Sequence, residues 1–293
     1  IKTTKKVAVH FHDINKADDL NVIRDIYACG RTNGVFQFES DGIKKALTGF
    51  NPTSIDDVIL MNAAYRPGPM DSIPEITEVK NGTEKPNYII PQMEQILGKT
   101  YGSAIYQEQI MQLFQLVGFS LGEADVIRRA MSKKHLDEIE AAKDKFVSGM
   151  IEQGGKPADV EKFWIRLLAF ASYAFNKSHA AAYSIVSYYT AFLKYYFPCE
   201  YLSAQLSYTP EKLKLFLSDL KYAGLTLLQP DINSGVPNFA PMPGNNKQIR
   251  FGIKAIKGVS AAAQIIYDLR DTKKSNPNAH HLGPCKDYKD FIV

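Results

Sequence analysis

The stretch Tyr173-Ala-Phe-Asn-Lys-Ser-His-Ala-Ala-Ala-Tyr183 opens the longest apolar segment of the chain and decides the class of its fold. Small and aromatic residues continue without glycine or proline to Tyr196, and Pro198 follows shortly after. Ser178 fits the N-cap position, so the pattern predicts one long helix from Ser178 to about Tyr196. Serines, a lysine and several tyrosines interrupt its apolar residues, which favours a buried helix over a membrane span.

Helical patterns continue on both sides of this stretch. Upstream, apolar residues recur at helical spacing in the segments 17–27, 43–50, 55–65, 106–117, 121–131, 136–151 and 160–171. Downstream, helices are expected over 212–223 and 261–269, with short strands at 225–228 and 249–253. Gly34–Phe38 alternates like a short strand, whereas prolines interrupt 70–100 and predict a looser region. The fold is therefore predicted to be mainly α and multi-helical, with a small α+β piece at the C-terminus.

The composition is that of an ordinary globular protein. Hydrophobic residues make up 45% and charged residues 23% of the 293 residues, and the formal net charge is +4. Such a small excess of positive charge does not by itself indicate a nucleic-acid partner. Cys29, Cys199 and Cys285 are far apart, so we expect free thiols in a reducing, cytoplasmic setting without a membrane segment. The first residue is Ile1 and the last segment looks like an unfinished helix, so we expect a fragment of a longer chain.

A dense basic cluster is the strongest local feature. The segment Arg128-Arg-Ala-Met-Ser-Lys-Lys-His135 contains four permanent cations within seven residues. Because Ile127 and Ala130 must pack against a core, the two arginines have a fixed origin on a helix. Such a pair suits bidentate binding of phosphate. Alternatively, the cluster is a solvated helix end that the helix dipole stabilises slightly.

Three further segments are candidates for binding. Asn176-Lys-Ser-His179 precedes the long helix, and a helix N-terminus holds phosphates or carboxylates well. Alternatively, Ser178 is a simple cap and the histidine an ordinary first-turn residue. Tyr65-Arg-Pro-Gly-Pro69 places Arg66 at a stiff turn, where it either faces a ligand or is solvated. Tyr106-Gln-Glu-Gln109 forms a polar helix start whose glutamines contact base edges or simply cap their neighbours.

The sequence has no pattern for catalysis by bound metal ions. Nucleotidyl transfer by two metals needs clustered carboxylates, often two at i and i+2 on one strand face. The chain contains no Asp-x-Asp, and the neighbours Asp18–Asp19 and Asp56–Asp57 would face opposite sides of a strand. Walker, dinucleotide-binding, nucleophile-elbow and zinc-protease motifs are also missing from the sequence. We therefore expect no catalytic and no metal-binding residue in this chain.

Taken in order, the conspicuous segments resemble the bacterial DNA polymerase III alpha subunit, the type C replicative DNA polymerase. The matching segments, spread over about residues 13–260, are Gly34-Val-Phe-Gln-Phe-Glu-Ser40, Tyr65-Arg-Pro-Gly-Pro69, Tyr101-Gly, Tyr106-Gln-Glu-Gln109, Arg128-Arg-Ala-Met131 with Lys133-Lys134, Phe175-Asn-Lys-Ser-His179 with Ala181-Ala-Tyr183, Pro230-Asp-Ile-Asn-Ser-Gly235, Gly252-Ile and Ala255-Ile-Lys-Gly-Val259. The chain departs from the family pattern at Ser132 and Ser260, where glycine is usual, and at Asp41, where a basic or small residue is usual. The aspartate is expected to reduce local affinity for phosphate.

The resemblance implies a division of the chain into three regions. Residues 1–30 would be the end of the palm or a connector, 31–209 the helical fingers domain, and 210–293 the C-terminal part of the fingers leading toward a helix-hairpin-helix region. The palm, with the carboxylates that hold two Mg²⁺ ions, lies outside this chain. The parent protein would be a DNA-directed DNA polymerase, and this fragment alone is expected to be inactive.

The resemblance also implies ligands and partners. The ligands are the incoming dNTP and primer–template DNA, whereas the sliding clamp and other replisome subunits would bind parts outside this chain. The residues implied to bind dNTP or DNA phosphates are Arg66, Arg128, Arg129, Lys133, Lys134, Asn176, Lys177, Ser178, His179 and Tyr183. The alternative function is a nucleic-acid-binding or scaffold module that derives from the polymerase but takes no part in catalysis.

Overall fold

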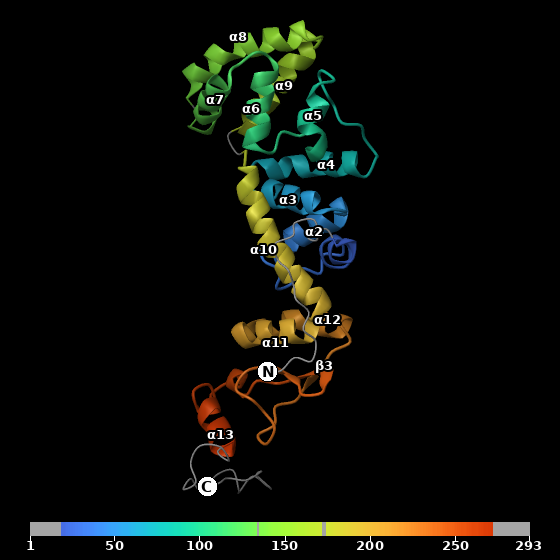
Figure 1. Ribbon diagram of the computed structural model, residues 1–293, viewed down its shortest axis with the longest axis vertical. Coiled ribbons are helices and arrows are strands. Elements are labelled where there is room, and N and C mark those ends of the chain that lie inside the picture. The colour runs from blue at the N-terminus through green and yellow to red at the C-terminus, as the bar shows by residue number, and fades with distance from the viewer. Residues whose placement is uncertain (1–18, 134, 172–173, 272–293) are drawn as a thin grey trace. The chain divides into compact units, whose positions relative to one another are not determined.

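The computed structural model describes residues 19–133, 135–171 and 174–271 (Figure 1). The chain divides into two compact units between Ala191 and Phe192, inside the long helix α10 (Lys177–Tyr196). The three functional regions that the resemblance implies are a different division of the chain, and they stay a prediction. No helix in the described part of the chain is long and apolar enough to cross a membrane.

Unit 1 is built from helices. Its α-helices are α1 (Leu20–Val22), α2 (Asp41–Phe50), α3 (Ile55–Ala64), α4 (Ile73–Lys80), α5 (Met93–Leu97), α6 (Gln107–Leu116), α7 (Leu121–Lys133), α8 (Leu136–Glu152), α9 (Pro157–Ala171) and most of α10. The π-helical turn η2 (Ile23–Ala28) and the 3-10 turns η3 (Pro69–Ser72) and η4 (Gly98–Thr100) join them. A mainly helical fold is therefore confirmed.

Helices α6 to α9 pack on one another and enclose an apolar core of unit 1 (Figure 1). The rings of Phe114, Phe146 and Trp164 meet at its centre, with centroid distances between 4.8 and 6.2 Å. The helix α10 runs along the earlier helices instead. Its Ser184 accepts a hydrogen bond from the buried Asn62 at 3.1 Å. This contact ties the start of α10 to α3.

Several helices of the described residues have a proline in their first turn. Ser54 caps α3 as predicted, because its hydroxyl accepts a hydrogen bond from the backbone N–H of Asp57 at 3.2 Å. The prediction of a loose region over 70–100 is wrong in part: α4 and α5 lie there, with Pro74 in the first turn of α4, whereas residues 81–92 between them form neither helix nor strand. Pro198 does follow the end of α10, but it also begins α11 (Pro198–Tyr208), a helix that the sequence pattern missed. Proline is tolerated at these positions because its missing N–H has no partner in the first turn of a helix.

The segment Gly34–Phe38 is not a strand. Gly34 and Gln37 have positive φ angles of 75° and 69°, which turn the backbone twice within five residues. Val35 and Phe38 are fully buried, and their spacing of three residues differs from the two-residue spacing of one face of a strand. The loop leaves Phe36 at the surface, 38% exposed.

Unit 2 is a small α+β unit, as predicted. Its elements are α11, the 3-10 turn η5 (Pro210–Lys212), α12 (Leu213–Tyr222), β1 (Thr226–Leu228), β2 (Ala240–Met242), β3 (Asn245–Arg250), the 3-10 turn η6 (Ile253–Ala255) and α13 (Ala262–Asp271). In the sheet, β3 lies between a parallel β1 and an antiparallel β2. The strand predicted at 249–253 therefore begins and ends earlier, and β2 was not predicted.

Unit 2 buries an ion pair beside its apolar core. Helix α11 packs on β2 and β3, and Phe216, Leu206 and Ile249 are fully buried. Lys194 Nζ lies 2.6 Å from Asp219 Oδ1, and each side chain is only 6% exposed. The buried Cys199 and the exposed Cys29 are free thiols, and burial raises the pKa of Cys199 to about 11. Cys285 lies outside the described residues.

Candidate functional site

The cationic end of α7 is organised by one carboxylate. Arg128 donates from Nε and Nη2 to Asp125 Oδ1, at 3.0 and 2.8 Å, and Arg129 donates from Nε to Asp125 Oδ2 at 2.8 Å. Hydrogen bonds from Arg129 and Arg128 lower the pKa of Asp125, so this carboxyl is ionised at neutral pH. The sequence predicted the arginine pair but missed Asp125, although its i−3 and i−4 spacing on one helix was a readable signal.

Gln107 connects this cationic end to the beginning of α10. Its Oε1 accepts a hydrogen bond from Arg128 Nη1 at 3.1 Å. Its Nε2 donates to the carbonyl of Ala174 at 3.1 Å, and its backbone N–H donates to the carbonyl of Phe175 at 3.0 Å. One side chain at the start of α6 therefore joins two segments that are almost fifty residues apart in the sequence.

The N-terminus of α10 already contacts a carboxylate of the protein. Both oxygens of Glu108 accept the backbone N–H of Lys177 at 3.2 Å. The cap of this helix is Asn176 and not Ser178 as predicted, since Asn176 Oδ1 accepts the backbone N–H of His179 at 2.9 Å. The Ser178 hydroxyl lies 2.5 Å from the same oxygen. The helix therefore starts one residue earlier, at Lys177.

A shallow pocket lies at the start of α10. Its walls are Gln107, Phe175, Asn176, Ser178 and His179. Arg128, Arg129 and Lys177 do not line it, although Arg128 is hydrogen-bonded to Gln107 in its wall. The ammonium of Lys177 lies 5.5 Å from the centre of the Tyr106 ring. The structure thus brings Arg128 close to the Asn176–His179 segment, and the binding of a ligand there stays a prediction.

Aromatic side chains form a row beside this pocket, which we call the aromatic row. It consists of Phe175, just before α10, His179 and Tyr183 in the first two turns of α10, and Phe36 from the loop before α2. The centroid distances are 5.2, 4.3 and 5.6 Å in that order, and the rings of His179 and Tyr183 are stacked. The row is open to solvent, because His179 is exposed and Tyr183 and Phe36 are each 38% exposed.

Arg66 ends the aromatic row as a stacked cation. Its guanidinium carbon lies 3.4 Å from the centre of the Phe175 ring, and burial lowers its pKa. The turn Pro67–Pro69 restricts the backbone next to this arginine, because proline fixes its own φ angle and limits the residue before it. Gly68 supplies the positive φ angle of 101° that the turn requires. A guanidinium on an aromatic face gains cation–π energy and leaves its edge able to donate hydrogen bonds.

The remaining predicted site residues lie at the end of α7. Arg129 is 63% exposed and pairs with Asp125, and Lys133 is exposed at the last residue of the helix. Neither lines the pocket at the start of α10. Lys134 lies outside the described residues.

The described residues contain no group of three His, Cys, Asp or Glu side chains that could hold a metal ion. The neighbours Asp56 and Asp57 are engaged by lysines: Lys99 lies 3.1 Å from Asp56, and Lys80 lies 2.6 Å from Asp57. In the described part of the chain, the acidic residues near the candidate site, Glu108 and Asp125, accept hydrogen bonds from protein groups.

The described part of the chain is therefore a mainly helical module with a cationic helix end and an exposed aromatic row. The chain belongs to the family of bacterial DNA polymerase III alpha subunit finger domains, whose family model matches residues 1–154.

Curated relatives extend the similarity over most of the chain. The DNA polymerase III subunit alpha of Treponema pallidum is 42% identical over 251 residues, which are 84% of this chain and 21% of that protein. The protein of the same name from Aquifex aeolicus is 39% identical over 280 residues, 94% of this chain and 24% of its own length. That from Halalkalibacterium halodurans is 40% identical over 92% of this chain and 24% of its own. The chain thus spans about a quarter or less of the relatives it matches.

Proposed function

We propose that this chain is the part of a bacterial replicative DNA polymerase that binds the incoming dNTP and the primer–template DNA. The observation that carries the proposal is the hydrogen bond from Arg128 to Gln107. Through it, a guanidinium suited to phosphate lies one side chain away from the pocket at the start of α10. Two predicted binding segments, each with an ordinary structural explanation of its own, thereby become one surface.

The aromatic row supports contact with bases as well as with phosphates. Bases of any sequence stack on exposed aromatic rings, and the cationic end of α7 attracts the backbone that connects them. A phosphate would compete with Asp125 for the two arginines, and Arg129, whose side chain is 63% exposed, would be the easier of the two to release because an exposed ion pair contributes little. Asn176, Lys177, Ser178, His179 and Tyr183 would act in positioning the nucleotide and the template.

Nucleotidyl transfer itself belongs to the parent polymerase in this proposal. There, Mg²⁺ ions held by palm carboxylates outside this chain would activate the primer hydroxyl and stabilise the leaving group. The present chain would position the triphosphate and neutralise its charge, which lowers the barrier without a covalent step. The sliding clamp and other replisome subunits would bind other parts of the parent protein, in the bacterial cytoplasm.

The test compares two glutamines of α6 in the full polymerase. Gln107→Leu removes the bridge to Arg128, whereas Gln115→Leu makes the same chemical change at an exposed position near the other end of the helix. We expect Gln107→Leu to lower kcat/KM for dNTP about tenfold, the loss of a hydrogen bond to a charged group, and Gln115→Leu to leave it unchanged. Equal kinetics of all three enzymes would contradict the proposal and favour the scaffold function. The isolated chain should not extend a primer with magnesium or manganese.

A further inference from the structure

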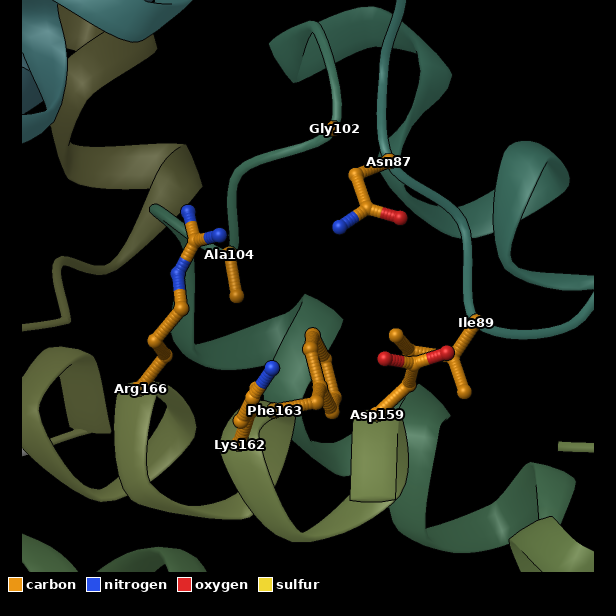
Figure 2. A pocket seen from close by; sticks show the side chains of 8 residues that line it. All are labelled: Asn87, Ile89, Gly102, Ala104, Asp159, Lys162, Phe163 and Arg166. Atoms are coloured by element: carbon orange, nitrogen blue, oxygen red, sulfur yellow. The ribbon is translucent and has the colours of Figure 1, made fainter. Parts of the chain in front are cut away.

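A second pocket in unit 1 lies between α9 and the segments before and after α5 (Figure 2). Its volume is about 140 Å³, and it shares no lining residue with the pocket at the start of α10. Figure 2 shows side chains rising from α9 on one side and the amide of Asn87 facing them from the opposite loop. The proposed binding of dNTP and DNA does not use this pocket.

The α9 wall of this pocket is one face of a helix. Asp159, Lys162, Phe163 and Arg166 line it, and their i, i+3, i+4 and i+7 spacing places them side by side. Phe163 is half-buried and packs against the apolar core that α6 to α9 enclose. Its ring lies between the side chains of Lys162 and Asp159 in the pocket (Figure 2). The pocket therefore has an aromatic floor between charged groups.

The opposite wall adds two apolar side chains and one amide. Ile89 and Ala104 line the pocket across from the α9 face, and Ala104 is almost fully buried. Asn87 is exposed at the mouth, and its side chain offers both a donor and an acceptor. A mostly apolar cavity with a few convergent polar groups is the usual form of a small-molecule site.

The charges around the pocket cancel. Lys162 and Arg166 supply two positive charges, and Asp159 and Glu75 supply two negative ones, since Arg166 Nη2 donates to both Glu75 oxygens at 2.9 and 2.6 Å. A free phosphate or carboxylate therefore meets no excess of positive charge. The lining favours a neutral, flat ligand with donors and acceptors along its edge.

We propose that this pocket binds a nucleobase. The base would lie on Phe163, with its edge hydrogen-bonded to Asn87 and to the charged ends of Asp159 and Lys162. Asparagine pairs in bidentate fashion with the donor and acceptor of an adenine edge, and aromatic rings stack with every base. The volume leaves room for one six-membered ring of a base, because a cavity of about 150 Å³ in another protein holds benzene. The base belongs either to a free nucleoside or nucleotide or to a single strand of nucleic acid, and the chemistry is the same.

Calorimetric titration of the chain tests this site with four probes. They are adenosine, cytidine, a short single-stranded oligonucleotide and the same oligonucleotide with abasic positions. The variants are Asn87→Ala and Lys162→Ala, and Lys156→Ala is the matched control, because Lys156 is exposed just before α9 and does not line the pocket. We expect Asn87→Ala to weaken binding of a base about tenfold, the loss of one bidentate contact, and Lys156→Ala to leave it unchanged.

The outcomes separate the two sources of the base. Binding of a nucleoside that depends on Asn87 supports the proposal with a free ligand. Binding of the oligonucleotide alone, weaker without bases and weaker in Asn87→Ala, supports it with a single strand. The proposal is overturned if no nucleoside binds and the two oligonucleotides bind equally. It is also overturned if oligonucleotide binding is lost in Gln107→Leu but unchanged in Asn87→Ala, since that binding belongs to the start of α10.

Discussion

Two aspartates of unit 1 each hold cations, and their surroundings are opposite. Asp57, in the first turn of α3, and its partner Lys80 are only 5% and 8% exposed. Asp125, in α7, is 26% exposed, and its partner Arg129 is 63% exposed. The same chemical pairing therefore holds the fold together in one place and keeps cations accessible to solvent in the other.

The buried pair is part of a closed network. Lys80 Nζ lies 2.6 Å from Asp57 Oδ2, and the Tyr101 hydroxyl donates to Asp57 Oδ1 at 2.8 Å. Burial raises the pKa of Asp57, but hydrogen bonds from Lys80, the backbone N–H of Thr53 and Tyr101 outweigh it and leave this pKa below its usual value. Since α3, the end of α4 and the segment after η4 all meet here, the network fixes the chain that leads to Gln107.

The largest expected effect comes from opening that network. Lys80→Ala leaves the carboxylate of Asp57 buried without its cation, so we expect the free energy of unfolding to fall by about 3–5 kcal/mol. Lys99→Ala is the matched control: its lysine pairs with the neighbouring Asp56 at 3.1 Å, but the two side chains are 75% and 47% exposed. The control should cost about 0–1 kcal/mol. Chemical denaturation of both variants measures the difference, and equal losses would break the contrast between buried and exposed pairs.

A smaller effect is expected from Arg129 and Lys177, and it concerns catalysis instead of folding. In the full polymerase, Arg129→Ala and Lys177→Ala should each lower kcat/KM for dNTP. The corresponding rise in activation free energy should be about 1.5–3 kcal/mol, the range for hydrogen bonds to charged groups. Thermal unfolding should change little, because Arg129 is mostly exposed. Steady-state primer extension together with a melting curve checks both halves. Wild-type kinetics, or a loss of folding as large as that of Lys80→Ala, would count against the assignment.

The sequence predicts local features of this fold better than contacts between distant segments. The cap at Ser54 and the arginine pair are local patterns, and they were found. Pro74 and Pro198 were taken as breaks although they begin helices, because a proline alone does not show on which side the helix lies. Within the site, the sequence predicts Gln107 and Glu108 as part of a polar helix start whose glutamines contact base edges or cap their neighbours. Their contacts with Arg128 and Lys177 depend on packing between helices, which no spacing along one helix encodes.

Acid should separate the two aspartates further. A carboxyl whose pKa is lowered on folding adds stability above its unfolded pKa of about 3.9, and this stability is lost as the pH falls through the folded value. The pKa values of both Asp57 and Asp125 are lowered. At about 1 M salt, where screening acts over about 3 Å, only the buried Asp57 should keep its contribution. Asp57→Asn should therefore flatten the acid dependence of unfolding at high salt, and Asp125→Asn should not. Equal profiles would contradict the difference in burial.

The smallest expected effect concerns DNA binding by the cationic end of α7. Contact with about three phosphates predicts a slope of roughly −2 to −3 in log affinity against log salt, without sequence preference. Arg129→Ala should reduce the size of this slope by about one, the loss of a single phosphate contact. Asp125→Asn should strengthen binding at low salt, because it removes the carboxylate with which DNA competes for Arg128 and Arg129. Asp57→Asn, in the closed network, should leave the slope unchanged while the protein stays folded.

Fluorescence anisotropy with a labelled primer–template duplex measures all four proteins. A flat salt response, a clear sequence preference, or equal slopes for wild type and Arg129→Ala would show that DNA does not bind at the end of α7.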